Sequence, residues 1–356
     1  MTDKRSVGIA LVGAGKIGRH RARLCAEHAG VGFLTIADLD ASKAQRLAEE
    51  VNADGWSTDV PDIVGSDDVN AVIVSTEEKA HRQPVITALN SGKPTLVEKP
   101  IALTLEDADA MIAAADEAGV PLWVGYSMRY AQRYAVGKQQ MSEKRIGEVV
   151  GGLARCFDTQ AVAEAILGRS PGATPVMDIL TYLIDAVGWY HPQRPVEVVA
   201  RSNGSTMRTR GHDADDLTVA IVTYEDGSVF EFATSYTLPK GYPINGMAAR
   251  IELLGTDGVL LITEDHGDQI LYSEVGYENA YVDQGSLNLA FLGSRTSGEW
   301  AQGRMFGRVA DETRAWLDHL TTGAPLHITP AWEARQTLAV TLAIDEAART
   351  GRRIEL

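Results

Sequence analysis

The sequence predicts an α/β protein of two domains, a doubly wound parallel sheet followed by an α+β domain built on a mostly antiparallel open sheet. The 356 residues exceed what one hydrophobic core normally supports. Up to about Trp123, short β-branched runs alternate with longer amphipathic stretches, as in parallel strands joined by crossover helices. After a helical bridge around Arg129–Lys144, strands are separated by turn signals instead. We place the domains at 1–126 and 127–356, and the final helix could pack back on the first.

The first domain alternates strands and helices. The expected strands are Val7–Val12, Gly32–Ala37, Ala71–Ser75, Thr95–Glu98 and Leu122–Gly125. The expected helices are Lys16–Ala29, Ala41–Val51, Lys79–Ser91 and Leu105–Ala118. Glycines at 30, 92 and 119 stand where C-terminal helix caps belong, because glycine accepts a left-handed backbone. Such a run of βα units implies a doubly wound sheet.

The second domain is rich in strands. They are expected at Glu148–Phe157, Val196–Arg201, Leu217–Tyr224, Ser228–Thr237, Arg250–Leu254 and Val259–Thr263. Asp226-Gly227 and Thr256-Asp257-Gly258 are typical of hairpin turns. One helix is expected near Pro175–Trp189, and two more at about Arg304–Thr322 and Pro330–Arg349. The weak periodicity of Asp265–Glu299 indicates a loop-rich stretch.

Composition excludes several classes of protein. The formal charge of −15 opposes binding to phosphate backbones and anionic lipids, so neither nucleic acid nor membrane is an expected partner. Cys25 and Cys156 lie far apart, outside any metal-ligand or disulfide pattern, and no metal is expected. The apolar run Val7–Val12 is too short for a signal peptide or membrane span, which predicts a cytoplasmic protein.

The segment Gly13-Ala14-Gly15-Lys16-Ile17-Gly18 follows the first strand directly and opens an amphipathic helix. This context is what the dinucleotide-binding fingerprint of a Rossmann fold requires. Gly13 permits the tight turn, Gly15 lets the backbone approach a pyrophosphate, and Gly18 allows close packing of helix on strand. The helix start, Lys16 and Ile17, offers N–H donors to phosphates.

The second predicted strand ends at Asp38, twenty positions past Gly18. A carboxylate there accepts hydrogen bonds from the adenosine ribose hydroxyls and repels a 2′-phosphate. No arginine follows in Leu39-Asp40, so NAD is favoured and NADP remains the alternative. Asp38 also suits a turn cap before the next helix, and both roles can hold at once.

These motifs and two later ones resemble the glucose-fructose oxidoreductase, inositol dehydrogenase and rhizopine-catabolism family (Gfo/Idh/MocA). The later ones are Gly92-Lys93-Pro94-Thr95-Leu96-Val97-Glu98-Lys99-Pro100 and Gly125-Tyr126-Ser127-Met128-Arg129-Tyr130. The resemblance continues through Arg145-Ile146-Gly147-Glu148 and Ile251-Glu252-Leu253-Leu254-Gly255-Thr256-Asp257-Gly258 to the final helix. It therefore covers nearly the whole chain.

In that family the Glu-Lys-Pro motif supplies a catalytic lysine beside the nicotinamide, which by resemblance is Lys99. The local chemistry agrees, because the carboxyl end of a parallel strand faces the ligand crevice. Pro100 restricts Lys99 to extended geometry, and in relatives this peptide bond is often cis. An exposed lysine at a strand end is the structural alternative.

The family's second catalytic element reads Asp-x-Gly-x-His-x-x-Asp, and the matching stretch runs from Asp178 to Asp185. Tyrosine stands at 182 for the histidine, as in the glucose-fructose oxidoreductase and dihydrodiol dehydrogenase branches, and Leu180 replaces the glycine. With Thr174 as N-cap, Asp178 and Tyr182 are expected on one helix face. Tyr182 is expected to pair with Lys99 in handling a proton, and Asp178 to orient the substrate hydroxyl.

Further site residues follow from the resemblance. Cofactor contacts are expected from Ser75, Thr76 and Glu98, and from His81 as the lesser possibility beside a structural role. Tyr126 and Arg129 are predicted to line the substrate pocket, although Arg129 could equally be an ion-pair residue. Position 77 departs from the family, with Glu in place of the usual Pro.

Together these features predict reversible hydride transfer between NAD and a secondary alcohol of a cyclic polyol, sugar or sugar derivative. The alternatives are a dihydrodiol dehydrogenase acting on a possibly carboxylated ring diol, and a non-catalytic dinucleotide sensor, which the altered helix motif permits. A homodimer or homotetramer is expected through the C-terminal sheet, because an open sheet face of this kind needs covering.

Overall fold

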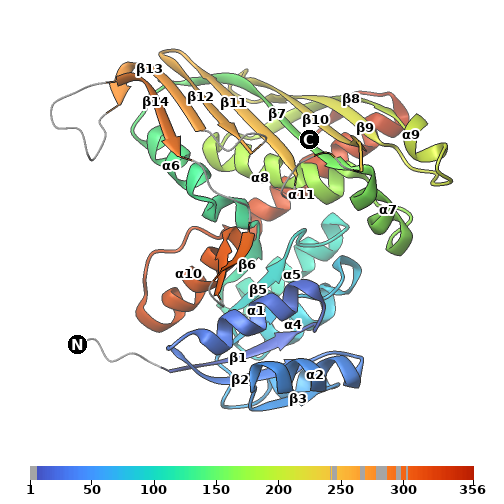
Figure 1. The fold of residues 1–356 in the computed structure, drawn as a ribbon, viewed down its shortest axis with the longest axis vertical. Coiled ribbons are helices and arrows are strands. Elements are labelled where there is room, and N and C mark those ends of the chain that lie inside the picture. Colours follow the sequence, from blue (N-terminus) through green and yellow to red (C-terminus); the bar gives the residue numbers. More distant parts are fainter. Residues whose placement is uncertain are drawn as a thin grey trace. The chain divides into compact units, whose positions relative to one another are not determined.

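The computed structural model describes residues 6–240, 242, 247–264, 269–277, 287–293, 298–301 and 304–356. The chain forms two compact units (Figure 1). Unit 1 comprises Met1–Tyr130 and Gly298–Leu338, and unit 2 comprises Ala131–Ser297 and Ala339–Leu356. The long helix α11 (Ala331–Thr350) contributes its first part to unit 1 and the rest to unit 2.

Unit 1 is built on a seven-stranded sheet. Across the sheet, the strands are β17 (Thr329–Pro330), β6 (Leu122–Gly125), β5 (Thr95–Glu98), β4 (Ala71–Val74), β1 (Val7–Val12), β2 (Val31–Ala37) and β3 (Gly55–Ser57). All neighbours pair in parallel except β17 with β6. The strand order reverses between β1 and β4, and such a switch point opens a ligand crevice at the carboxyl ends of the strands.

Helices cover both faces of this sheet. They are α1 (Lys16–Glu27), α2 (Ala41–Val51), α3 (Val60–Val64), α4 (Arg82–Asn90), α5 (Leu105–Ala118) and α10 (Arg308–Thr322), with 3-10 turns η1 (Glu78–Ala80) and η2 (Ser127–Tyr130). Helix α1 packs against α2 and α10, and α4 packs against α3 and α5. Trp316 and Leu317 of α10 join Ile9, Ile36 and Ile73 in one buried cluster. The late segment of the chain therefore completes the core that the N-terminal strands begin.

Unit 2 is built on a nine-stranded sheet. Across it, the strands are β14 (Leu287–Gly293), β13 (Gln269–Tyr277), β12 (Gly258–Thr263), β11 (Ala248–Gly255), β7 (Val149–Thr159), β10 (Val229–Leu238), β9 (Leu217–Tyr224), β8 (Pro195–Asn203) and β18 (Ile354–Glu355). Only the β10–β7 pair is parallel among these. The predicted mostly antiparallel open sheet is confirmed.

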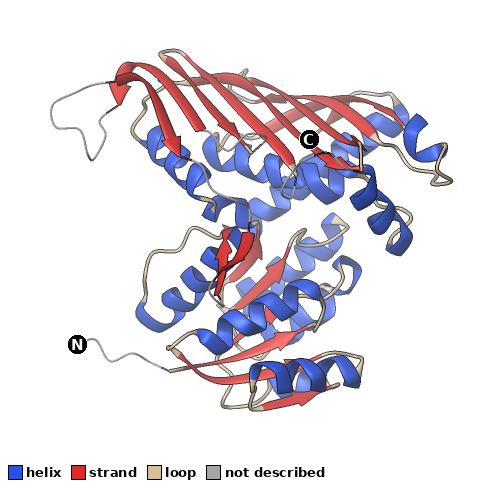
Figure 2. Cartoon of the chain, viewed as in Figure 1, coloured by secondary structure: helices blue, strands red, loops and turns tan. Residues whose placement is uncertain are grey.

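In the described part of unit 2, the helices lie on one face of this sheet (Figure 2). They are α6 (Gln132–Ser142), α7 (Gln160–Arg169), the π-helical turn η3 (Val176–Leu180), α8 (Thr181–Tyr190) and α11, with the short α9 (Ser205–Arg208) at one end. Along β9, residues alternate between buried and exposed, so Thr218, Ala220 and Val222 face the helices. The opposite face, called the open face here, carries exposed apolar residues: Leu153, Val199, Leu217, Val219, Ile221, Val229 and Leu254.

Most expected elements of unit 1 are confirmed, several with identical bounds. Gly119 caps α5 in the left-handed conformation with φ 64°, as predicted. Gly30 does not cap α1, because that helix already ends at Glu27 and His28 takes up extended geometry as its cap. The stretch 304–322 is not one helix, since the strand β16 (Arg304–Gly307) precedes α10 and Gly307 breaks the chain direction with φ 103°.

One expectation for the predicted second domain was wrong, and one of its helices was not expected. The stretch 265–299 was expected to be loop-rich, yet β13, β14 and the start of β15 (Gly298–Ala301) lie within it; residues 265–268, 278–286 and 294–297 fall outside the described part. Strands β13 and β14 are defined by backbone pairing with their neighbours in the sheet, which needs no periodicity in the sequence. Helix α7 was missed, because its apolar residues form no clear stripe; Thr159 caps it through the N–H of Val162.

Candidate active site

The three glycines of the turn after β1 differ in the space around them. A Cβ at Gly13, where φ is 104°, would lie 2.5 Å from the carbonyl oxygen of Ser75, and one at Gly18 would lie 1.9 Å from that of Gly13. Only glycine fits either position. A Cβ at Gly15 would meet nothing within 4 Å, so the backbone there borders open space. Gly15 is also the N-cap of α1 and offers no side chain to the first-turn donors, which include Lys16 and Ile17.

Asp38 ties the glycine turn to the end of β2. Its Oδ2 accepts the N–H of Ala14 at 2.8 Å and its Oδ1 accepts that of Asp40 at 2.9 Å. The helix cap is Asp40, whose carboxylate accepts the N–H of Ser42. Each carboxylate oxygen can accept a second hydrogen bond, so the turn role of Asp38 is compatible with ribose hydroxyls as further donors.

Two hydroxyls at the carboxyl end of β4 are left without partners. Ser75 Oγ and Thr76 Oγ1 are buried, and neither has a hydrogen-bond partner within the described part of the chain. Ser75 lies against the glycine turn, where its N–H donates to Val12. A buried hydroxyl without a partner loses free energy of hydration, so these groups suit a polar ligand at the switch point. The residues present therefore fit a dinucleotide.

Lys99 follows β5 directly, at the same edge of the sheet as the glycine turn, and its side chain is half-buried. The Lys99–Pro100 peptide bond is cis, as the resemblance implied. The preceding residue, Glu98, is held by an ion pair with Arg21 of α1, Oε1 to Nε 2.5 Å. Arg21 also contacts Glu312 of α10 at 2.6 Å. The backbone that presents Lys99 is thus anchored from two helices.

This anchor is deeply buried. The side chains of Arg21 and Glu312 are 1% and 0% exposed. A Cβ at Gly125 would lie 2.8 Å from Nη2 of Arg21, so the network leaves no room for a side chain at that position on β6. The sequence pointed to Glu98 as a cofactor contact; the structure gives its carboxylate a structural partner, and the cofactor role remains a prediction.

His81 is fully buried between the segments that follow β4 and β5. Its Nδ1 lies 3.0 Å from the carbonyl oxygen of Pro100, and its Nε2 lies 3.3 Å from that of Thr76. Burial lowers the pKa of the imidazole below its usual value. These contacts match the structural role that the sequence favoured for this histidine.

Tyr126 and Arg129 lie just beyond β6 and are both buried. Arg129 forms an ion pair with Glu333 of α11, Nη2 to Oε2 2.7 Å. The ion-pair alternative for Arg129 is therefore present in the structure, and its role in a substrate pocket stays a prediction, as does that of Tyr126.

Asp178 and Tyr182 belong to unit 2, where Thr174 caps the helix start by accepting the N–H of Met177. The helix does not begin as a regular α-helix: η3 is a π turn, and α8 starts at Thr181. The wider π turn therefore changes the spacing that was expected between Asp178 and Tyr182 on one α-helical face. Single π turns within helices are frequent at functional sites. The pairing of Tyr182 with Lys99 joins residues of different units and stays a prediction.

Sequence reasoning missed two polar residues next to Asp178. The hydroxyl of Tyr236 on β10 donates to Oδ2 of Asp178 at 3.0 Å. Asp158 on β7 is buried, and its burial, with the charge of Asp178, raises its pKa to about 6. Burial and the nearby carboxylates likewise raise the pKa of Tyr236. Along β7 and β10 alternate residues are buried, and Asp158 and Tyr236 stand at buried positions of this alternation. This period of two is the sequence signal from which both could have been predicted.

Two models of one protein family match this chain, one in each half. Residues 7–126 match the model of the oxidoreductase family with an NAD-binding Rossmann fold (GFO_IDH_MocA), and residues 138–356 match its C-terminal alpha/beta domain. The chain belongs to the Gfo/Idh/MocA oxidoreductase family. The resemblance seen in the motifs is confirmed, and the N-terminal part of unit 1 is an NAD-binding domain.

Relatives of this Gfo/Idh/MocA protein act on cyclic polyols and sugars. A 1,5-anhydro-D-fructose reductase from Ensifer adhaerens is 29% identical over 244 residues, 66% of this chain and 72% of the relative. A scyllo-inositol 2-dehydrogenase (NAD(+)) from Bacillus subtilis is 26% identical over 271 residues, 73% of this chain and 74% of the relative. The crystal structure of scyllo-inositol dehydrogenase from Lactobacillus casei with NAD(H) and scyllo-inositol has the same fold, with a TM-score of 0.77, 18% identity and 99% of both chains covered.

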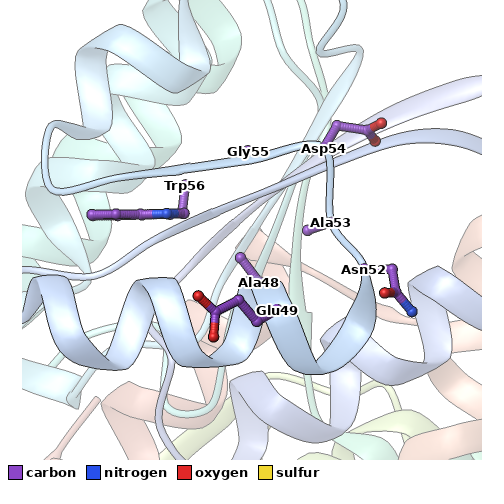
Figure 3. A pocket seen from close by; sticks show the side chains of 7 residues that line it. All are labelled: Ala48, Glu49, Asn52, Ala53, Asp54, Gly55 and Trp56. Atoms are coloured by element: carbon purple, nitrogen blue, oxygen red, sulfur yellow. The ribbon is translucent and has the colours of Figure 1, made fainter.

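Two surface hollows lie away from the predicted site residues. One lies between α2 and β3, at the far edge of the unit 1 sheet, and is lined by Ala48, Glu49, Asn52, Ala53, Asp54, Gly55 and Trp56 (Figure 3). The other lies beside the end of α1 and α10, with Arg304, Arg314 and Asp318 among its lining residues. Neither contains a residue of the glycine turn or of the Lys99 segment.

The described residues contain neither a cluster suited to a metal ion nor a helix suited to span a membrane. No group of three or more His, Cys, Asp or Glu side chains among them is arranged to hold a metal ion. In the same part of the chain, no helix combines the length and the apolar character that a membrane span needs.

Proposed function

We propose that this Gfo/Idh/MocA protein transfers a hydride reversibly between a secondary alcohol of a cyclic polyol, sugar or sugar derivative and the nicotinamide of NAD. The observation that carries the proposal is the position of Lys99. It follows β5 at the strand ends where the glycine turn, Asp38 and the partnerless hydroxyls of Ser75 and Thr76 also lie. The names of the relatives supply the class of substrate.

The residues of the site divide the work. When bound, NAD supplies the hydride acceptor at C4 of its nicotinamide. Lys99, with Tyr182 as its partner, takes the hydroxyl proton of the substrate and returns it in the reverse direction. Asp178 accepts a hydrogen bond from a substrate hydroxyl and so fixes which carbon faces the cofactor. Its hydrogen bond from Tyr236 supports this role, because a carboxylate held by a tyrosine has a fixed orientation.

Asp38 favours NAD over NADP in this proposal. Its two oxygens are held at the end of β2 by hydrogen bonds from the backbone N–H groups of Ala14 and Asp40. The adenosine ribose of a Rossmann ligand lies at this end of the strand. A carboxylate at this position repels a 2′-phosphate.

The purified protein is expected to reduce NAD in the presence of a cyclic polyol. The assay follows NADH formation with scyllo-inositol and myo-inositol, and NADH consumption with 1,5-anhydro-D-fructose, each repeated with the NADP couple. Turnover with one substrate class and a lower KM for NAD than for NADP supports the proposal. Tight binding of NAD without turnover of any ring polyol, sugar or dihydrodiol would instead indicate the dinucleotide sensor.

We also propose that the protein forms a homodimer or homotetramer through the open face of unit 2. This face carries exposed apolar residues on consecutive strands, among them Val219, Ile221 and Leu153. Charged residues of both signs border them, such as Glu231 and Arg155. A face with both signs of charge around an apolar centre can complement a second copy of itself across a two-fold axis.

The substitution Ile221→Glu is expected to shift the protein toward the monomer in sedimentation velocity. Ile221 lies beside Val199 and Glu231, so a carboxylate there places a second negative charge next to an existing one within the apolar face. Val162→Glu on α7 is the matched control, because Val162 is similarly exposed but lies outside the sheet. A monomeric wild type, or an unchanged assembly in Ile221→Glu, contradicts the proposal.

A cytoplasmic location is part of the same proposal. Cys25 and Cys156 are both buried and form no disulfide, as is usual for proteins that fold in a reducing compartment.

A further inference from the structure

We infer that His81 is a positioning residue, which sets the place of the Lys99 amine by donating a hydrogen bond to the carbonyl oxygen of Pro100. The inference rests on the proposed function and goes beyond it. It assigns His81 a role in turnover and separates that role from cofactor binding.

The ring of His81 meets backbone carbonyl groups at both of its nitrogens. Nδ1 lies 3.0 Å from the oxygen of Pro100 and 3.4 Å from that of Ile101, and Nε2 lies 3.3 Å from that of Thr76. Burial keeps the ring neutral by lowering its pKa, so it carries a single N–H. The shortest of the three contacts assigns that hydrogen to Nδ1, with Pro100 as the acceptor.

The backbone of His81 is a firm base for this bond. His81 joins η1 to α4, where its N–H donates to Glu78 and its carbonyl oxygen accepts the N–H of Val85. The side chain is 0% exposed, so water does not compete for its hydrogen bonds. A displacement of the Pro100 carbonyl would break the hydrogen bond inside the protein, where water cannot replace it.

Lys99 is therefore fixed on both sides. On the amino side, Glu98 is held by Arg21; on the carboxyl side, Pro100 is held by His81. The same imidazole touches Thr76, whose hydroxyl is one of the two partnerless groups at the switch point. Through this hydrogen bond, His81 ties the segment after β5, where the amine begins, to η1 and α4, which follow β4. A catalytic group displaced by about 1 Å can lose about 10²-fold in rate.

Three variants separate the two ring nitrogens. His81→Asn keeps a donor at the place of Nδ1, His81→Gln keeps one near the place of Nε2, and His81→Leu keeps neither. His319→Leu is the matched control, because Nδ1 of His319 also faces a backbone carbonyl group, that of Ala324, at 2.7 Å. For each variant we would measure Kd for NAD, and kcat and KM for whichever polyol the assay proposed above identifies as a substrate.

We expect His81→Leu to lower kcat by about 10- to 100-fold, the range for a misplaced catalytic group, with Kd for NAD as in the wild type. His81→Asn should recover most of kcat and His81→Gln should not. A loss of NAD affinity in His81→Leu at unchanged kcat would make His81 a cofactor contact and overturn the inference. Equal losses of kcat in the Asn and Leu variants would overturn it as well.

A second readout needs neither cofactor nor turnover. Lysines of the apoprotein are reductively methylated with ¹³C-formaldehyde, and the Lys99 signal is assigned by its absence from Lys99→Met. We expect this signal to shift in His81→Leu and to keep its position in His81→Asn and His319→Leu. An unshifted signal in His81→Leu refutes the positioning role whatever the substrate is, whereas a shifted signal in a protein without polyol activity would fault the proposed function alone.

Discussion

Lys99→Met is expected to lower kcat/KM for the polyol by about 10²- to 10⁴-fold, the usual contribution of a positioned acid–base group, and to leave Kd for NAD unchanged. Methionine keeps the length of the side chain and removes the amine, so the hydroxyl proton of the substrate loses its acceptor. The glycine turn and Asp38, which are expected to bind the dinucleotide, are untouched. Steady-state kinetics and calorimetric titration with NAD measure the two quantities.

Lys93→Met is the matched control for this change. Lys93 belongs to the same motif but precedes β5, where its ammonium group donates to the carbonyl oxygens of Ser66 and Val69. Its substitution should leave kcat/KM near the wild-type value. If Lys99 and Tyr182 act as one unit, Lys99→Met with Tyr182→Phe should cost little more than Lys99→Met alone, because the effects of cooperating groups do not add. Wild-type turnover in Lys99→Met would refute the assignment.

Arg21→Met is expected to lower the free energy of unfolding by about 3–5 kcal/mol, the usual cost of removing one partner from a buried ion pair. The substitution leaves the carboxylates of Glu98 and Glu312 without their shared cation in an interior position. The hydrogen bond from Nη1 to Thr313 is lost as well. Urea unfolding followed by circular dichroism measures the change.

Arg19→Met is the control on the same helix. Arg19 is paired with Glu50 but its side chain is 53% exposed, so its loss should lower the free energy of unfolding far less than the loss of Arg21. Adding Glu98→Gln and Glu312→Gln to Arg21→Met should restore part of the stability, because no buried charge then remains uncompensated. A triple variant less stable than Arg21→Met would show that the loss has another origin than charge burial.

The local features of the nucleotide-binding half were predictable from the sequence. Gly13 and Gly18 could be assigned from spacing alone, and the structure confirms that neither position accepts a Cβ. The strand β5 and the helix α5 have the expected bounds because their apolar residues repeat with the period of each element. The family resemblance rested on the same motifs and is confirmed over both domains.

Other features escaped the sequence for identifiable reasons. The π turn η3 was expected as α-helix, because the spacing from Asp178 to Tyr182 does not reveal an extra residue in the turn. The strands β13 and β14 are defined by pairing: β13 pairs with β12, and β14 pairs with β13 at the edge of the sheet. Asp158 and Tyr236 lie on strands that come close to Asp178 only when the sheet has formed.

The sequence by itself determined the binding turn and the place of the lysine, because a tight turn, a helix start and a strand end depend on residues a few positions apart. Only the tertiary structure decided what holds that lysine in place. Arg21 and Glu312 are 291 positions apart, and His81 reaches Pro100 from another segment. Burial is what makes these contacts strong, and burial belongs to the assembled core rather than to any stretch of the chain.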